Sequence, residues 1–373
     1  MDALFTADGR RDPAVTARAA HVAGCGYAFV TAALHDRRLT ATPISPSDDV
    51  MFQVAARFLS RMNHDRHRAA RAAFTGLFSP RRVQQYRARI ATTAAQLIDA
   101  LPGSGPVDIV AAFARPLPFT VICGVLGVPD DRQPWLAKHL ETFGRGVAGQ
   151  RERANIEAGN AAALEMLAYF DDLLRQRQHQ PTNDVLSLLA GSQEADERRD
   201  DILANCIFFV LAGHDTTTTL ITAGVHLLST HPDQLASVLN DQTSWSTTVE
   251  ELLRFVSPTT LTGVTTTQDL EVAGCPVPAG ANRAVVFAAA NRDPSVFDNP
   301  DSFDAARSPN PHVAFSAGVH FCLGAPLARL HAEVALGLLF SRLPRLHAVS
   351  EPEWLGSVPI RQVTQLSVDW ERT

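Results

Sequence analysis

A cysteine stands in a glycine-containing loop that leads directly into a predicted helix near the end of the chain. The run from Phe315 to Arg329 reads FSAGVHFCLGAPLAR. Backbone N–H groups and the positive end of the helix dipole favour a thiolate at Cys322, while Gly318 and Gly324 permit a tight path and the close approach of a flat cofactor. A lone cysteine is more often a small buried hydrophobe, but a thiolate in these surroundings can ligate iron from one side.

A second segment places an acid and several hydroxyls in the middle of an apolar helix pattern. It occupies residues 207–219 and reads IFFVLAGHDTTTT. Four consecutive threonines lower helix propensity, and their hydroxyls can bond to carbonyls one turn back, so we expect a local kink. An alternative is a helix that begins with Asp215 as its N-cap. The apolar residues on both sides favour one helix that continues through the segment.

Two further pairs of residues have spacings that place them on one face of a helix. Glu251 and Arg254 are three residues apart, and His67 and Arg71 are four apart. An acid and a base at this spacing can pair, although exposed pairs contribute little to stability. Two basic side chains on one face can grip an anionic group, and the alternative is an ordinary basic surface.

The cysteine loop closely resembles the haem-binding signature of the cytochrome P450 family. The pattern F-x-x-G-x-H-x-C-x-G followed by A-P-L-A-R specifies too many positions to arise readily by chance. The resemblance implies haem b as cofactor and Cys322 as the axial thiolate ligand of its iron, whose electron donation favours O–O cleavage. It also implies that four further residues contribute to cofactor binding: Phe315, Gly318, His320 and Gly324.

The threonine-containing segment is similar to the oxygen-activation motif A-G-x-[DE]-T-[TS] of the same family. It matches at Ala212, Gly213, Asp215, Thr216 and Thr217. By this resemblance Ala212 and Gly213 leave room over the distal face of the cofactor. Thr216 would donate a hydrogen bond to dioxygen, and Asp215 would help to relay protons, which makes these two the expected catalytic residues.

The pair of Glu251 and Arg254 resembles the E-x-x-R element of the family. In the family this element is buried against an arginine of the irregular segment that follows. Arg307 has the position of that third member, beside Glu251 and Arg254. The resemblance implies that these three residues hold the haem side of the core and do no chemistry.

The basic helix face resembles an H-x-x-x-R element that binds a haem propionate. We therefore expect His67 and Arg71 to bind a propionate, with His320 and His312 as the other candidates. One position departs from the family, because Val264 stands where an arginine commonly binds a propionate. The resemblance thus implies that haem is held somewhat less tightly.

Helical spacing of apolar residues dominates the chain and predicts a mainly α protein. The expected helices cover residues 81–101, 154–177, 198–229, 246–255 and 326–342; residues 19–34 should form a helix and a strand, 270–280 a hairpin, and 291–311 an ordered meander. The resemblance extends from about residue 29 to the end and implies the cytochrome P450 fold, with a small β-rich part, as a single domain over 1–373. Because the stretch before His67 is short, we expect a reduced N-terminal region and an open entrance to the substrate pocket.

Composition excludes several classes of partner. The 373-residue chain has 33 Lys and Arg against 39 Asp and Glu, without a basic stripe, so we expect no nucleic acid partner. Its five cysteines are scattered and form no C-x-x-C pair, which predicts neither a disulfide framework nor a zinc site and favours a reducing compartment. The densest apolar run, 207–212, is too short to span a bilayer, so we expect no membrane partner and a cytoplasmic location.

The resemblance implies a soluble, bacterial-type haem-thiolate monooxygenase of secondary metabolism. It would oxidise, and most simply hydroxylate, a modestly apolar small molecule with dioxygen. Electrons would come from a separate ferredoxin-type donor with its reductase, because the sequence shows no flavin or ferredoxin module. The same site is also compatible with oxidative coupling, ring closure or peroxide-driven oxidation. A non-catalytic haem-binding sensor is a further alternative, which Asp215 and Thr216 disfavour.

Overall fold

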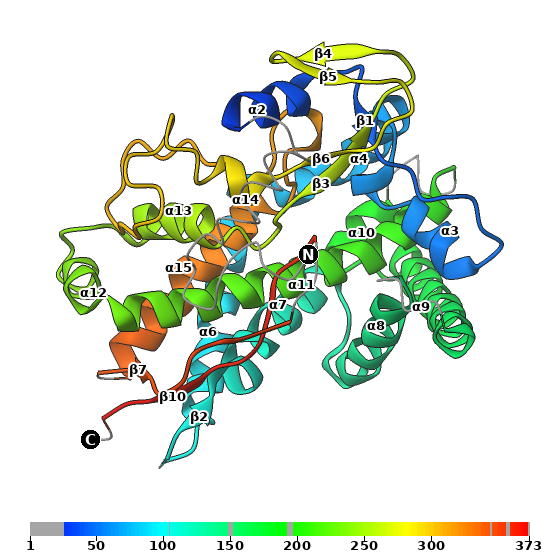
Figure 1. Cartoon of the computed structure of the whole chain (residues 1–373). Coiled ribbons are helices and arrows are strands. Elements are labelled where there is room, and N and C mark those ends of the chain that lie inside the picture. Colours follow the sequence, from blue (N-terminus) through cyan, green and yellow to red (C-terminus); the bar gives the residue numbers. More distant parts are fainter. Residues whose placement is uncertain are drawn as a thin grey trace. The chain divides into compact units, whose positions relative to one another are not determined.

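The structure, a computed structural model, describes residues 26–103, 105–147, 152–191, 197–343, 345–355 and 359–371 (Figure 1). These residues form two compact units, a larger one of residues 26–40, 83–118 and 215–371 and a smaller one of residues 41–82 and 119–214. Two long helices, α7 (Pro116–Leu126) and α11 (Arg199–Thr230), contribute residues to both units, and so does the short helix α5 (Pro80–Val83). A single domain over 1–373 stays a prediction.

The larger unit contains the C-terminal helices and almost all of the strands. Its helices are α2 (Tyr27–His35), α6 (Arg87–Asp99), α12 (Pro232–Leu239), α13 (Trp245–Val256), α14 (Phe287–Ala290) and α15 (Ala325–Arg342), with single turns at Gln84–Tyr86, Val110–Ala114 and Gly318–His320. Helix α13 begins after Ser244, whose hydroxyl accepts a hydrogen bond from the Thr247 N–H at 3.1 Å. It ends at Ser257, whose φ of 46° cannot continue a right-handed helix.

The strands form two small sheets and two hairpins. One sheet has the strand order β1 (Thr40–Ala41), β3 (Thr262–Thr265), β6 (Arg283–Val285), and the other has the order β2 (Val107–Asp108), β10 (Ser367–Asp369), β7 (His347–Ala348). The hairpins pair β4 (Leu270–Val272) with β5 (Cys275–Val277) and β8 (Glu353–Leu355) with β9 (Gln362–Gln365). Ala273 and Gly274 turn the first hairpin with φ values of 49° and 80°, as a two-residue hairpin turn requires. The hairpin expected within residues 270–280 is therefore confirmed.

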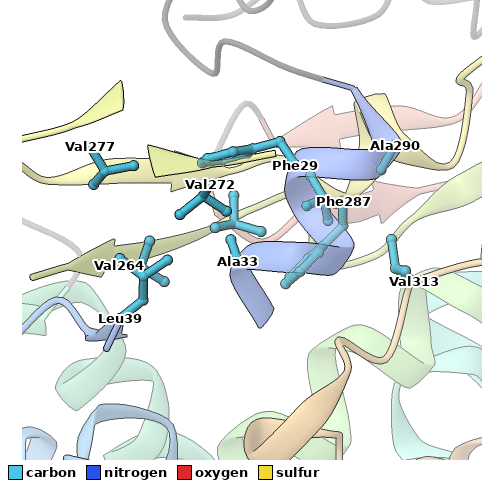
Figure 2. Packing of buried hydrophobic residues seen from close by; sticks show 11 residues of the cluster. Phe29, Ala33, Leu39, Val264, Val272, Val277, Phe287, Ala290 and Val313 are labelled. Atoms are coloured by element: carbon cyan, nitrogen blue, oxygen red, sulfur yellow. The ribbon is translucent and has the colours of Figure 1, made fainter. Parts of the chain in front are cut away.

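An apolar cluster packs helix α2 against these strands (Figure 2). Phe29 and Ala33 of α2 meet Val264 of β3 and Val285 of β6, and all four side chains are at most 8% exposed. The cluster also contains valines from the β4–β5 hairpin, Val272 and Val277, as well as Val30, Leu39, Phe287, Ala290 and Val313. Burial of this apolar surface fixes α2 beside the sheet.

The smaller unit is helical. Its helices are α3 (Val50–Ala56), α4 (His64–Thr75), α5 (Pro80–Val83), α8 (Gln133–Val147), α9 (Arg153–His179) and α10 (Val185–Ala190), with short 3-10 turns at Leu59–Arg61, Gly76–Phe78 and Asp130–Arg132. The buried side chain of Asn205 on α11 accepts a hydrogen bond from the Leu59 N–H at 2.9 Å and donates one to the Arg57 carbonyl at 2.9 Å. These bonds fix the first half of α11 to the chain that precedes α4.

Most of the expected helices are confirmed to within two residues. Those expected at 154–177, 198–229, 246–255 and 326–342 correspond to α9, α11, α13 and α15. The helix expected at 81–101 is divided, because Gln84–Tyr86 tightens into a 3-10 turn between α5 and α6, a distinction that apolar spacing does not resolve. Of the stretch 19–34, residues 19–25 lie outside the described part, and the remainder belongs to α2 rather than to a strand.

Helix α11 passes through the threonine segment as one helix of 32 residues. The alternative that a helix begins at Asp215 is therefore wrong, whereas the expected kink stays a prediction. By length and composition α11 could also cross a membrane, and 61% of the apolar window concerned is buried inside the protein. The apolar run 207–212 is thus only part of a longer apolar helix, whose length the run alone does not indicate.

The cysteines differ from expectation at one position. Cys123, Cys206 and Cys322 are free thiols, whereas Cys275 is disulfide-bonded. The sequence suggests no disulfide framework, and spacing along the chain does not report the bond at Cys275, because it does not show which residues meet in space.

The expected ion network of Glu251, Arg254 and Arg307 is present, and its central pair is fully buried. Both side chains of the Glu251–Arg254 pair are 0% exposed, and Arg254 donates through Nε and Nη2 to the two carboxylate oxygens at 2.7 Å each. Arg307 donates to Glu251 Oε2 at 3.1 Å. Arg254 also donates to the carbonyls of Asn291 at 2.9 Å and Pro300 at 2.8 Å. The network therefore joins α13 to the meander expected at 291–311.

Replacing Arg254 by alanine should destabilise the protein severely. The variant leaves the Glu251 carboxylate buried with a single cationic partner, and breaking a buried pair costs about 3–5 kcal/mol. Arg153→Ala on α9 is the matched control, because its ion pair with Glu157 joins side chains that are 92% and 65% exposed and should contribute about 0–1 kcal/mol. Urea unfolding followed by circular dichroism measures both, and equal midpoints would show that the buried pair behaves like a surface pair.

Candidate active site

Cys322 differs from the other free cysteines that the structure describes. Burial raises the pKa of Cys123 and of Cys206 to about 12, so neither thiol ionises near neutral pH. Cys322 is partly exposed. Among the described free cysteines it is therefore the one that is not buried.

The loop holds Cys322 at the start of helix α15, as expected. The Cys322 N–H donates to the Phe315 carbonyl at 2.9 Å, and α15 begins at Ala325 with Gly324 as its N-cap. A Cβ placed on Gly324 would lie 4.0 Å from the Cys322 sulfur. The helix start thus directs its dipole toward the sulfur, an arrangement that stabilises a thiolate.

Gly318 is required by its surroundings. Its φ is 63°, and a Cβ there would lie 2.2 Å from the backbone oxygen of Leu34 and 3.1 Å from the carbonyl carbon. Backbone atoms cannot move aside as a flexible side chain can. The loop therefore passes directly over the end of α2, and any residue larger than glycine would push the two apart.

A cluster of charged side chains supports the loop from the side of α13. Arg329 donates to Glu250 through Nε at 2.6 Å and Nη2 at 2.8 Å, and its guanidinium lies 4.6 Å from the ring centre of Phe315. His312 Nε2 is 2.9 Å from Glu250. Burial raises the pKa of Glu250, but the hydrogen bonds from Arg329 and His312 outweigh it and lower the pKa to about 2. Glu250 is therefore ionised at neutral pH and holds together the two elements that carry Arg329 and His312.

The structure corrects the expectation for His312. Its Nδ1 accepts a hydrogen bond from the Ala314 N–H at 3.2 Å, so the proton lies on Nε2, which faces Glu250. Both ring nitrogens are occupied within the chain, and neither is left to bind a propionate. Sequence reasoning missed Glu250 and Arg329, because their pairing joins positions that no short motif connects.

The centre of α11 is partly exposed although the helix on either side is largely buried. Residues 211–216 have intermediate exposure, whereas the helix is buried at Val210 and again from Thr217 to Val225. Gln362 of β9 donates to Asp215 Oδ2 at 2.7 Å. This contact fixes the carboxylate, and no motif or spacing in the chain predicts it. Thr216 and Asp215 belong to the larger unit together with Cys322.

The other expected cofactor residues lie in both units. His67 and Arg71 are one turn apart on α4, with His67 buried and Arg71 partly exposed, and Ala212 and Gly213 lie on the first half of α11; all four belong to the smaller unit. A Cβ on Gly213 would meet Ile122 of α7 at 3.4 Å. His320 belongs to the larger unit, in the turn Gly318–His320. Their roles toward haem stay predictions.

The donor set fits a haem-thiolate group. Among the described residues no group of three His, Cys, Asp or Glu side chains could hold a metal ion. A partly exposed cysteine at a helix start fits haem, whose macrocycle would supply the other iron ligands. Beside the thiol, Phe321 is 41% exposed and presents an apolar surface suited to a flat ring system.

Comparison with known proteins agrees with this chemistry. A model of the family described as "Cytochrome P450" matches residues 243–348. The "Biotin biosynthesis cytochrome P450" of Bacillus subtilis is 34% identical over 334 residues, which cover 88% of this chain and 84% of the relative. The "6-deoxyerythronolide B hydroxylase" of Saccharopolyspora erythraea is 35% identical over 366 residues, which cover 92% of this chain and 88% of the relative.

The fold is also found in solved structures. The crystal structure of P450BioI in complex with hexadec-9Z-enoic acid ligated acyl carrier protein has a TM-score of 0.87 and 33% sequence identity, and the match covers 93% of this chain and 91% of that one. The fold and the relatives define a haem-thiolate oxidoreductase of the mainly α class with small sheets. The chain belongs to the cytochrome P450 family and is a monooxygenase.

Alanine at Gly318 should disrupt the cysteine loop, and alanine at Gly280 should not. Both glycines have positive φ, 63° and 71°, so each substitution carries about 1–2 kcal/mol of backbone strain. A Cβ at Gly280 meets nothing within 4 Å, whereas one at Gly318 meets the Leu34 backbone. Haem content and thermal midpoint should fall much further in Gly318→Ala, and equal losses in the two variants would contradict the predicted backbone contact.

Proposed function

We propose that this cytochrome P450 hydroxylates a modestly apolar small molecule of secondary metabolism, with dioxygen as oxidant and haem b as cofactor. Two electrons come from a separate ferredoxin-type donor and its reductase, in the cytoplasm. The observation that carries the proposal is the accessible thiol of Cys322 at the start of α15, in a chain whose other described free thiols are buried.

The proposal gives the loop residues distinct tasks. Haem ligated by Cys322 supplies the site at which dioxygen is activated. Gly318 and Gly324 allow the backbone to run close to the ring, and Phe315 contributes the carbonyl that receives the Cys322 N–H. Glu250, with Arg329 and His312, keeps this loop in one conformation, which matters because the hydrogen bonds around a ligating sulfur tune its electron donation.

His67 and Arg71 on α4, together with His320 in the cysteine loop, bind the propionates in this proposal. Arginine is suited to this task because its planar guanidinium can donate two parallel hydrogen bonds to one carboxylate. Ala212 and Gly213 carry small side chains or none, and they leave space on the oxygen side of the ring.

Asp215 and Thr216 handle protons on that side. The Thr216 hydroxyl donates to dioxygen, and Asp215 restores the proton from the solvent side. The hydrogen bond from Gln362 Nε2 to Asp215 Oδ2, 2.7 Å long, limits the orientations of the carboxylate. A fixed carboxylate beside a partly exposed helix segment supports a relay in preference to a purely structural acid.

The substrate contacts three segments in this proposal: residues 207–217, residues 258–264 and the stretch before His67. Their side chains are mostly apolar or threonine, so a modestly apolar substrate is favoured. Oxidative coupling, ring closure and peroxide-driven oxidation would use the same residues and differ in whether an oxygen atom enters the product. A sensor would show no turnover with any electron donor.

Ligation by Cys322 is tested by the spectrum of the reduced protein under carbon monoxide. The wild type should show the strongly red-shifted Soret band of thiolate ligation, and Cys322→Ala should lose it. Cys123→Ala, which removes a buried thiol with a raised pKa, should keep it. A wild-type spectrum of histidine-ligated haem would refute the assignment of Cys322.

Thr216→Ala should uncouple electron consumption from product formation. Without the hydroxyl, protons are no longer directed to the correct oxygen atom of dioxygen, so the reducing equivalents should be lost as hydrogen peroxide. Substrate binding and the carbon monoxide spectrum should not change. Asp215→Asn should instead slow turnover, because the threonine contact survives. Thr230→Ala, at the exposed end of the same helix, is the matched control.

The measurement compares product, peroxide and electron-donor consumption with ¹⁸O-labelled dioxygen. Unchanged coupling in Thr216→Ala would exclude the role of its hydroxyl. An unlabelled wild-type product would move the enzyme to the coupling or ring-closing alternative, and equal activity of all variants with peroxide would favour the peroxide-driven one.

A further inference from the structure

The strand that carries Val264 has an arginine directly opposite it. Strands β3 and β6 are antiparallel, and their register pairs Val264 with Arg283 and Thr262 with Val285. Directly opposed residues of an antiparallel pair project from the same face of the sheet, with Cβ atoms about 4.5–5.5 Å apart. Arg283 therefore leaves the sheet beside Val264 and on the same side.

Helix α2 packs on that side of the sheet, and the end of α2 contacts the cysteine loop. Val264 and Val285 both belong to the apolar cluster that includes Phe29 and Ala33 of α2, and Figure 2 shows Val264 beside α2. At the end of α2, the Leu34 carbonyl would lie 2.2 Å from a Cβ on Gly318. Helix α2 thus contacts both the sheet face that carries Arg283 and the cysteine loop.

Arg283 has few partners in the chain. Its Nη2 donates to the Pro276 carbonyl at 3.1 Å, and its Nε is buried without a hydrogen-bond partner. Within the described residues it forms no ion pair, whereas two other arginines of this unit, Arg254 and Arg307, share a carboxylate. A partly buried guanidinium with an unused donor is costly unless an anion compensates it.

We infer that Arg283 binds a haem propionate and supplies from β6 the cation that position 264 of β3 does not carry. This inference rests on the proposed haem cofactor. A carboxylate of the cofactor would satisfy the free Nε and the second Nη donor in the parallel geometry that arginine offers. Arg283 acts as a positioning residue for the ring, and Val264 is left to pack in the apolar cluster.

The test measures haem dissociation by transfer to an excess of apomyoglobin. Arg283→Val should release haem about 10- to 100-fold faster than the wild type, the range expected for one charge-assisted pair. Val264→Arg in the same protein returns a guanidinium to the opposite position and should restore slow release. Valine is a strong strand former, so β6 itself should be preserved.

Haem dimethyl ester separates recognition of the propionate from a structural role. Its carboxylates carry no charge, so wild type and Arg283→Val should release the ester at equal rates. A difference that persists with the ester, or a release rate that Val264→Arg does not restore, would show that Arg283 supports the hairpin through Pro276 and would overturn the inference. Arg153→Val on exposed α9 is the control and should leave both rates unchanged.

Failure of this inference is distinguishable from failure of the proposed function. If the wild type shows the thiolate spectrum under carbon monoxide and Arg283→Val releases haem at the wild-type rate, the inference is overturned while the proposed function stands. If the wild-type spectrum is that of histidine-ligated haem or shows no haem at all, the proposed function is wrong and the inference falls with it.

Discussion

The carboxylate of Glu251 is removed from water and must therefore be satisfied by the protein. Arg254 and Arg307 provide its charge partners, and Arg254 uses its remaining donors on carbonyls of the meander. Each group is stable only while the others are in place, so α13 and an irregular segment with little regular hydrogen bonding fix one another. The side chain of Asn291 in that segment accepts a hydrogen bond from the Val313 N–H at 2.8 Å. This bond also fixes the chain that leads into the cysteine loop.

Helix α13 holds the loop from a second direction through the preceding residue. Neighbouring residues of a helix point about 100° apart, so Glu250 and Glu251 reach different parts of the chain. Glu250 binds Arg329, one turn into α15, and His312, which precedes the loop. The segment that contains Cys322 is thus attached at both ends to one helix. An axial ligand needs this rigidity, because a sulfur on a mobile loop could neither set its distance to the iron nor keep its hydrogen bonds.

Sequence reasoning succeeded where the physical signal is local. Apolar spacing placed the helices, the hairpin turn residues placed β4 and β5, and the loop composition placed Cys322 at the start of α15. It failed where the contact joins distant positions. The hydrogen bond from Gln362 to Asp215, the pairing of His312 with Glu250 and the disulfide of Cys275 depend on which surfaces the fold brings together. No residue type or spacing along the chain encodes those contacts.

Arg283, which lies opposite Val264 on the neighbouring strand, is another residue whose position in space the sequence does not reveal. A motif assigns a charge to one place in the sequence, but binding of a carboxylate requires only that a guanidinium reach it. Neighbouring strands are about 4.7–4.9 Å apart, which is less than the length of an extended arginine side chain, so either member of an opposed pair can deliver the charge to one point. With the arginine on β6, at position 283, the opposite position on β3 can hold an apolar residue. Val264 occupies that position and completes the cluster that packs α2 on the sheet. Loose haem binding therefore does not follow from the valine alone, and the relevant unit for reading such a site is the pair of residues across the strands.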